Sequence, residues 1–288
     1  DITSETNIFI LSDKKGDCGD LYTVNEVPHG NVSKVWYDSP TLKMQRRMTV
    51  YTPAGYDKGK DYPVLYLLHG AGGDEDAWTT LGRAQHILDN LIATGKAKPM
   101  VVVMTNGNPN CQAAPGEWSA GQYIPSFYGY QGAKPAATMD ESFPDVMNYV
   151  ESHYKVAKDK AHRAICGLSM GGGHSFDISR RFPTKFDYIG LFSAGLHVGT
   201  TGDFRNDFYK QLQGNEEAKT QLATLFKNKP KLYWIGMGKT DFLYKSSADL
   251  RRYFDEKGYK YTYMETEGGH IWRNWRVYLT EFAQKIFK

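Results

Sequence analysis

Short apolar segments recur along the chain, and each has the length of a β-strand. They are nearly continuous runs of apolar and β-branched residues, which is typical of strands buried on both faces of a sheet. Six such segments lie at residues 64–69, 100–105, 164–168, 188–192, 232–236 and 261–264. Before them, residues 35–37 and 48–51 predict a leading pair of antiparallel strands.

Segments with helical spacing of apolar residues alternate with these strands. They lie at residues 81–93, 142–154, 171–182, 216–226, 247–254 and 272–287. The alternation predicts an α/β fold with a mostly parallel central sheet and helices on both faces. We expect residues 28–288 to form one domain. Residues 1–27 are interpreted as an N-terminal extension, the remnant of an upstream module.

Residues 106–139 break this alternation. The segment contains glycine and proline without periodicity, and a stretch of this length inside a compact domain is usually functional. It follows the strand at 100–105, and loops at the carboxyl ends of parallel strands gather around the active site. We therefore expect its aromatic residues, Trp118 and Tyr123 in particular, to contact the substrate. The alternative is that these rings pack the loop against its own domain.

A glycine-flanked serine provides the first candidate for chemistry. Residues 167–171 read Gly-Leu-Ser-Met-Gly and stand between a predicted strand and a predicted helix, the context that a nucleophile elbow requires. The sharp turn strains the backbone of Ser169, so its neighbours must be small. This motif predicts that Ser169 is a nucleophile. The alternative is a glycine-rich turn whose serine only caps the helix.

A serine needs a base, and in this fold the histidine follows the serine and an acid in the chain. His270 stands after the strand at 261–264 and behind two glycines, so a loop can deliver its imidazole to the turn. His197 is the rival, but no acid-bearing strand end separates it from Ser169. The remaining histidines precede the serine or lie on the helix after it: His29, His69, His86, His153, His162 and His174.

The acid is expected at a strand end between the serine and the histidine. Asp241 follows the strand at 232–236 and is our prediction for the residue that orients the imidazole. Asp203 and Asp207 lack a preceding strand. Asp249 falls on a predicted helix, where a solvated carboxylate is the usual explanation.

Backbone amides are expected to form an oxyanion hole. Residues 69–73 read His-Gly-Ala-Gly-Gly after the strand at 64–68, and we predict the N–H groups of Ala71 and Met170 as the donors. A dinucleotide-binding loop is the rival interpretation, but its third glycine would fall at position 75, which is Glu75.

Composition and charge exclude several classes of protein. The chain is 41% hydrophobic and 23% charged, as in ordinary globular proteins, and its formal net charge of +3 includes no dense Lys/Arg run. We therefore expect neither a nucleic-acid partner nor an anionic membrane surface. The apolar runs are shorter than the about 20 residues that a membrane span needs. Position 1 is aspartate and no leader follows, so the sequence is either a processed protein or a trimmed piece of one. We expect an exported protein that is secreted, periplasmic or at the cell surface.

The three cysteines lack the spacing of a metal site, and no zinc-protease or P-loop pattern is present. We expect no metal and no cofactor. Cys166 lies in an apolar run and is predicted to be a buried thiol. Whether Cys18 and Cys111 form a disulfide is not readable from the sequence.

Three motifs together resemble the feruloyl esterases of carbohydrate esterase family 1. They are residues 67–73, 167–173 and 268–270, and the likeness extends over most of residues 28–288. The resemblance implies an α/β-hydrolase fold and matches Ser169, Asp241 and His270 to the family's triad. It also matches Trp275 to an aromatic position of the family's final segment, and we expect nearby Trp272 to bind substrate.

The resemblance implies a serine esterase that releases ferulic or related hydroxycinnamic acids from arabinoxylan through an acyl-enzyme. An acetyl xylan esterase with the same machinery is the alternative enzyme. A non-catalytic carbohydrate-binding protein on an esterase fold is the alternative of another class, although the complete triad argues against it. The expected partner is a feruloylated or acetylated xylan-type polysaccharide, with a carbohydrate-binding or glycoside hydrolase module fused upstream.

Overall fold

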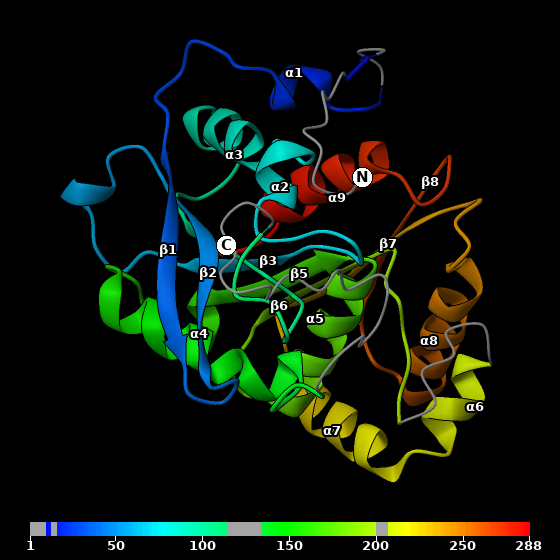
Figure 1. Cartoon of the computed structure of the whole chain (residues 1–288). Helices are drawn as coiled ribbons and strands as arrows, with labels where there is room; N and C mark the ends of the chain where they lie inside the picture. The colour runs from blue at the N-terminus through cyan, green and yellow to red at the C-terminus, as the bar shows by residue number, and fades with distance from the viewer. Residues whose placement is uncertain (1–9, 13–15, 115–133, 200–206) are drawn as a thin grey trace.

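An eight-stranded sheet forms the centre of the computed structural model, which describes residues 10–12, 16–114, 134–199 and 207–288 (Figure 1). Its order is β1-β2-β4-β3-β5-β6-β7-β8. The strands β1 and β2 pair antiparallel with each other, β2 pairs antiparallel with β4, and all other neighbours are parallel. The bounds are β1 Asn31–Ser39, β2 Met44–Thr52, β3 Val64–Leu68, β4 Val101–Thr105, β5 Arg163–Leu168, β6 Tyr188–Phe192, β7 Leu232–Gly238 and β8 Thr262–Thr266.

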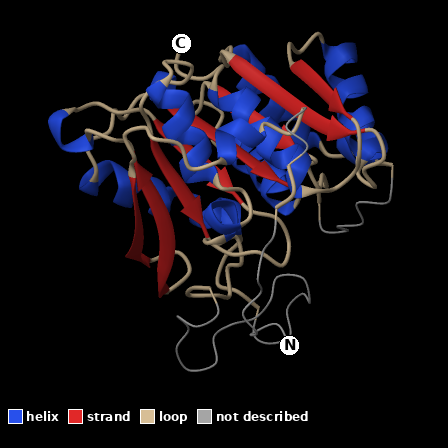
Figure 2. Cartoon of the chain, turned by 90° about the horizontal axis from the view of Figure 1, so that it is seen from above, coloured by secondary structure: helices blue, strands red, loops and turns tan. Residues whose placement is uncertain are grey.

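The predicted fold class is confirmed. All six predicted parallel strands and the leading antiparallel pair are present, with bounds that differ by a few residues. Every residue of β3, β4, β5 and β6 is buried, because helices cover both faces of the sheet in this region (Figure 2). This explains why these strands are continuously apolar rather than alternating.

Two layers of helices enclose the sheet and make two apolar cores. One core lies between the sheet and α4, α5, α6, α7 and α8, and the other between the sheet and α1, α3 and α9. The bounds are α1 Gly19–Tyr22, α2 Ala77–Thr80, α3 Ala84–Ala93, α4 Met139–His153, α5 Met170–Arg181, α6 Phe208–Gln213, α7 Glu216–Lys227, α8 Tyr244–Lys257 and α9 Trp272–Ala283. Short 3-10 turns stand at Tyr56–Lys58 and Lys160–His162.

Two helix boundaries differ from the prediction for local reasons. The helix predicted at 81–93 begins at Ala84 as α3, because Arg83 before it adopts a left-handed conformation with φ of 50°, and the separate short helix α2 precedes it. The helix predicted from residue 142 begins at Met139, because Thr138 and Glu141 form a reciprocal capping box there.

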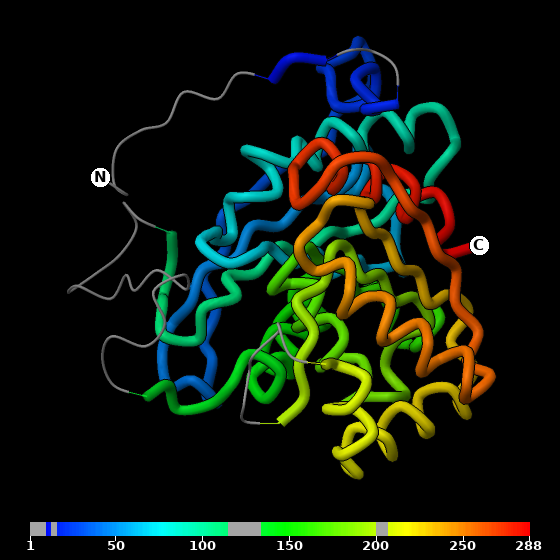
Figure 3. Tube along the Cα trace, turned by 90° about the vertical axis from the view of Figure 1, so that its right-hand side faces the viewer, coloured from blue at the N-terminus to red at the C-terminus, as the bar shows by residue number. Residues whose placement is uncertain are grey.

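The described part of the N-terminal segment packs on the domain, where α1 lies beside α3 and α9 (Figure 3). Tyr22 is buried; its hydroxyl donates to Asp17 at 2.8 Å, and Arg276 of α9 stacks over its ring at 5.0 Å. The division of the chain at residue 27 stays a prediction. In the same region, Cys18 does not form a disulfide with Cys111.

Two buried arginines of β2 hold the start of the segment after β4. Arg46 donates to the carbonyl oxygens of Cys111 at 2.6 Å and Asn108 at 2.7 Å, and also to that of Asn106. The neighbouring Arg47 pairs with the fully buried carboxylate of Glu75 at 2.7 Å. Glu75, the residue that argued against a dinucleotide-binding loop, therefore belongs to a structural ion pair with Arg47.

Glu75 also joins three parts of the chain. Besides the bond from Arg47, it accepts hydrogen bonds from the Asn106 side chain at 2.9 Å and from the Ala114 amide at 2.8 Å. A buried carboxylate with three donors leaves three unsatisfied groups if it is removed.

We predict that Glu75→Ala lowers the free energy of unfolding by about 3–5 kcal/mol, since it leaves the Arg47 guanidinium buried and unpaired. Urea unfolding followed by circular dichroism measures this. Glu281→Ala is the control, because its ion pair with Lys285 on α9 is exposed and is worth about 0.5 kcal/mol or less. Equal, small effects of the two substitutions would show that water already reaches the Glu75 network.

Candidate active site

Ser169 stands on a strained turn between β5 and α5. Its backbone has φ of 53° and ψ of −116°, a conformation that residues other than glycine rarely adopt. Hydrogen bonds on both sides fix this turn. The Ser169 amide donates to the carbonyl of Phe192 at 2.9 Å, and its carbonyl accepts from Gly195 at 2.8 Å and Gly173 at 3.0 Å.

The two glycines that flank the serine are needed for backbone contact. A Cβ atom at Gly167 would lie 2.5 Å from the carbonyl oxygen of Gly171. A Cβ atom at Gly171 would lie 2.5 Å from the carbonyl oxygens of Leu68 and His69. The strand, the turn and the helix of the predicted elbow are therefore present, with the required small residues in place.

The imidazole of His270 lies between Ser169 and Asp241. Its Nε2 is 2.9 Å from the Ser169 Oγ, and its Nδ1 is 2.9 Å and 3.1 Å from the two oxygens of Asp241. The Asp241 side chain is fully buried, and one of its oxygens accepts a hydrogen bond from the Leu243 amide at 2.9 Å. These three side chains come from the ends of β5, β7 and β8, which meet at one edge of the sheet.

The competing residues lie elsewhere or have other partners. His197 is exposed, and the imidazole that bonds to the Ser169 hydroxyl is that of His270. The Asp207 side chain caps α6 by accepting from the Lys210 amide at 3.2 Å, and Asp249 pairs with Lys245 at 2.8 Å. Asp203 lies outside the described residues, as do Trp118 and Tyr123.

The loop after β3 runs next to the serine. A Cβ atom at Gly70 would lie 3.2 Å from the Cβ of Ser169, so the loop and the turn are in contact. Burial lowers the pKa of His69 and keeps its ring neutral. Its Nδ1–H donates to the Gly70 carbonyl at 2.7 Å, and its Nε2 accepts from the Gly107 amide at 2.7 Å. This neutral imidazole joins the loop after β3 to the segment after β4.

A cavity of about 490 Å³, here called the Ser169 cavity, opens beside this arrangement. Ser169, His270 and the predicted oxyanion donor Ala71 line it together with Leu81, Ile271, Trp272 and Trp275. The rings of Trp272 and Trp275 lie nearly perpendicular at 5.1 Å, and Trp275 lies 4.9 Å from the His270 ring. The Trp275 indole N–H also donates to the Ser193 hydroxyl at 3.1 Å, which fixes this aromatic wall.

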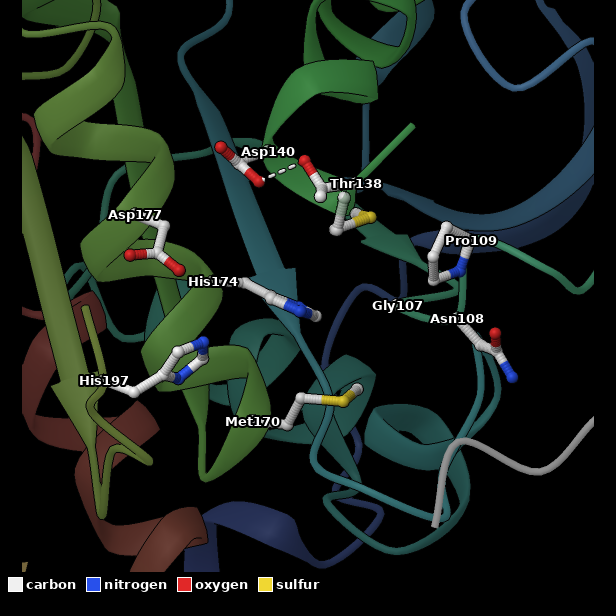
Figure 4. A pocket seen from close by; sticks show the side chains of 10 residues that line it. Gly107, Asn108, Pro109, Thr138, Asp140, Met170, His174, Asp177 and His197 are labelled. Atoms are coloured by element: carbon white, nitrogen blue, oxygen red, sulfur yellow. Dashed lines mark hydrogen bonds between the residues drawn. The ribbon is translucent and has the colours of Figure 1, made fainter. Parts of the chain in front are cut away.

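A second cavity of about 270 Å³, here called the His174 cavity, lies beside α5 (Figure 4). Met170 and His174 of α5 line it, facing Pro109 and the beginning of α4 at Thr138 and Met139. Burial lowers the pKa of His174 to about 4, so its imidazole is neutral at neutral pH. No sequence pattern pointed to this histidine, because the cavity is formed by segments far apart in the chain.

The described residues offer no metal centre and no membrane span. Within the described ranges, no three His, Cys, Asp or Glu side chains gather in a way that could hold a metal ion. No helix among them is long and apolar enough to cross a bilayer. The predicted buried thiol at Cys166 is confirmed, and burial raises its pKa well above the ordinary value.

The family of the chain follows from comparison with known proteins. The family model described as putative esterase matches residues 39–286. The chain belongs to this esterase family. It is 33% identical over 272 residues to an endo-1,4-beta-xylanase/feruloyl esterase of Xylanibacter ruminicola, a match that covers 91% of this chain and 32% of that protein. This esterase chain thus spans about a third of that relative.

Other relatives cover most of their own length. An acetyl esterase of Caldicellulosiruptor saccharolyticus is 24% identical over 87% of this chain and 90% of that protein. Among solved structures, a ferulic acid esterase of carbohydrate esterase family 1 from Anaeromyces mucronatus superposes with a TM-score of 0.69 at 25% identity, covering 94% of this chain and 96% of that one. The predicted resemblance to this group and the predicted α/β-hydrolase fold are confirmed.

The lowered pKa of His174 makes stability depend on pH. The imidazole is neutral in the folded protein down to about pH 4, whereas in the unfolded chain it takes up a proton near its ordinary value of 6.5. The free energy of unfolding that depends on a neutral His174 is therefore fully present above pH 6.5 and is lost as the pH falls toward 4. We predict that the wild type loses about 3 kcal/mol more unfolding free energy than His174→Gln between pH 7 and pH 4. Urea unfolding of both proteins at the two pH values tests this, and parallel losses would contradict it.

Proposed function

We propose that this chain is a carboxylic-ester hydrolase that releases ferulic or related hydroxycinnamic acids from xylan-type polysaccharide through an acyl-enzyme. The observation that carries the proposal is the His270 imidazole, which lies within hydrogen-bond distance of both the Ser169 hydroxyl and the buried Asp241 carboxylate. A serine, a base and an orienting acid in this arrangement are the parts of a nucleophilic triad.

In the first step, His270 Nε2 takes the proton of Ser169 as its Oγ attacks the ester carbonyl carbon. The carboxylate of Asp241 accepts from His270 Nδ1–H, so it holds the reactive tautomer and stabilises the imidazolium that forms. We assign the stabilisation of the resulting oxyanion to the N–H groups of Ala71 and Met170. Met170 opens a helix of 12 residues, where unpaired amides and the helix dipole favour negative charge.

In the second step, the imidazolium returns its proton to the oxygen of the departing alcohol, and the acyl group stays on Ser169. Water then attacks the acyl-enzyme with His270 again as the base. Because the proton comes from His270, the alcohol must leave on the His270 side, into the Ser169 cavity. Trp272 lines that cavity and offers an aromatic face against which a sugar ring can stack.

The substrate class rests on the relatives. The name of the Xylanibacter ruminicola protein joins xylanase and feruloyl esterase, and the Anaeromyces mucronatus structure is a ferulic acid esterase. The acetyl esterase from Caldicellulosiruptor saccharolyticus keeps acetylated xylan as the second candidate substrate. We expect the protein to act outside the cell on polysaccharide, joined to a carbohydrate-binding or glycoside hydrolase module.

We predict that Asp241→Asn lowers kcat by up to about 10⁴-fold with little change in substrate binding, because the amide favours the wrong His270 tautomer. Steady-state hydrolysis of methyl ferulate measures this. Asp207→Asn is the control, since that carboxylate only caps α6, and it should leave kcat unchanged. A mild effect at position 241 would remove Asp241 from the triad.

We predict that the protein hydrolyses methyl ferulate with a higher kcat/KM than it shows for acetylated xylan, and that Ser169→Ala removes both activities. The alanine fits the turn but cannot form the acyl-enzyme. Activity of Ser169→Ala above about a thousandth of wild type would contradict the nucleophile assignment. Release of acetate without release of ferulate would instead favour the acetyl esterase.

A further inference from the structure

Ser193 follows β6 in a strained conformation to which the proposed mechanism gives no role. Its φ is 45°, in the left-handed region where residues other than glycine are uncommon, and the residue is completely buried. Glycine would adopt this backbone without the clash of a Cβ atom. A non-glycine residue held in such a conformation points to a function of its side chain.

The segment that carries Ser193 also holds the nucleophile. Phe192 accepts a hydrogen bond from the Ser169 amide at 2.9 Å, and Gly195 donates to the Ser169 carbonyl at 2.8 Å. The Ser193 amide donates to the carbonyl of Gly236 in β7 at 2.9 Å, so the segment is bonded to the neighbouring strand as well. The backbone of Ser193 is therefore fixed in position relative to Ser169.

The Ser193 hydroxyl reaches His270 through Trp275. It accepts a hydrogen bond from the Trp275 indole N–H at 3.1 Å, and Trp275 is 6% exposed. The centroid of the Trp275 ring lies 4.9 Å from that of the His270 ring, with the two planes at 85°. Phe242 also lies against His270, with the ring centroids 4.6 Å apart, but it is 64% exposed. Of these two aromatic contacts, Trp275 is the one enclosed in the protein.

The His270 imidazole loses one of its hydrogen bonds during each turnover. In the resting protein, Nδ1 is bonded to Asp241 and Nε2 to Ser169. In the acyl-enzyme the Ser169 oxygen is joined to the acyl group and has no proton to give, so only the bond to Asp241 remains of the two. A ring bonded at one atom can swing about it, and Nε2 must stay in place to take a proton from the attacking water. Packing against the ring then keeps Nε2 in position.

The backbone of the His270 loop has an anchor of its own. The buried side chain of Asn274 donates to the carbonyl oxygens of Gly269 at 3.0 Å and Glu267 at 3.1 Å. These bonds hold the main chain that leads to His270 and do not involve its ring. Loss of the hydrogen bond to the indole therefore leaves the loop in place and acts on the orientation of the imidazole.

We propose that Ser193 and Trp275 are positioning residues, which hold the His270 imidazole in place in the acyl-enzyme while it activates water. This inference rests on the proposed esterase function and deepens it. It explains why a serine occupies a backbone conformation that favours glycine, since glycine would leave the indole N–H without its acceptor. The pair thus joins the strand end that fixes the nucleophile to the ring of the base.

The test is the pre-steady-state hydrolysis of p-nitrophenyl ferulate by Ser193→Ala. p-Nitrophenolate leaves as the anion when the Ser169 oxygen forms its bond to the acyl carbon, so an initial burst measures acylation, and its amplitude counts intact sites. Water then releases ferulate in the steady state. We expect the steady-state rate to fall about ten-fold, the value of one hydrogen bond, while the burst keeps its rate and amounts to one p-nitrophenolate per protein molecule.

Trp275→Phe tests the same hydrogen bond from its other end. Phenylalanine keeps an aromatic ring but lacks the N–H, so we expect a similar loss in the steady state. The double variant should be no slower than either single variant, because both substitutions remove one interaction. Trp275→Phe also decides the matter where Ser193→Ala does not fold, and a Trp275→Phe protein with the wild-type steady-state rate would overturn the proposal.

Ser179→Ala is the matched control. Ser179 is also completely buried and its hydroxyl donates to the Phe176 carbonyl at 3.2 Å, but it lies near the end of α5. Its replacement should leave both phases unchanged. In Ser193→Ala, a burst amplitude that falls in proportion to the steady-state rate would show loss of folded protein and overturn the proposal. Equal slowing of both phases, or a rise in KM alone, would overturn it too.

Failure of the proposed function gives a different result. In that case the wild type releases no ferulate from p-nitrophenyl ferulate or methyl ferulate. Failure of this inference alone leaves a wild type that hydrolyses both esters and a Ser193→Ala protein that matches it.

Discussion

Close backbone contact around the Ser169 turn is the constraint on which the rest of the site depends. The turn is bonded to β6 through Phe192 and to the following loop through Gly195, and Gly171 touches the end of β3. These contacts involve main-chain atoms and no flexible side chain. The position of Ser169 relative to its neighbours is thus set by the sheet itself, and its strained conformation persists because the surrounding contacts over-determine it.

The same sheet explains why much of the site could be predicted from the sequence. Ser169, Asp241 and His270 each follow a strand, and neighbouring parallel strands bring their carboxyl ends to one edge. Recognising the strands was therefore enough to predict that these side chains meet, although they are separated by 29 to 101 positions. The continuous apolar character of β3 to β6 likewise indicated burial on both faces.

Features that depend on contacts between distant segments were not predictable in this way. His174 appeared only as a histidine on the helix after the serine, because its cavity is completed by residues of α4 and of the segment after β4. The charged side chains of Arg46 and Glu75 gave no indication of burial, since the ion pair of Glu75 and most of the hydrogen bonds of both are made with residues more than 25 positions away. A local sequence pattern indicates the periodicity of a helix or strand, but it does not indicate which distant residue pairs with an isolated charged side chain.

The separate linings of the two cavities have a consequence for how specificity can diverge. Residues of α9 and the loop after β3 shape one cavity, and residues of α4 and the segment after β4 shape the other. The two sets of elements are linked where His69 and Glu75 bond to Gly107 and Asn106. Substitutions at lining residues outside these contacts can therefore change the shape of one cavity without changing the other.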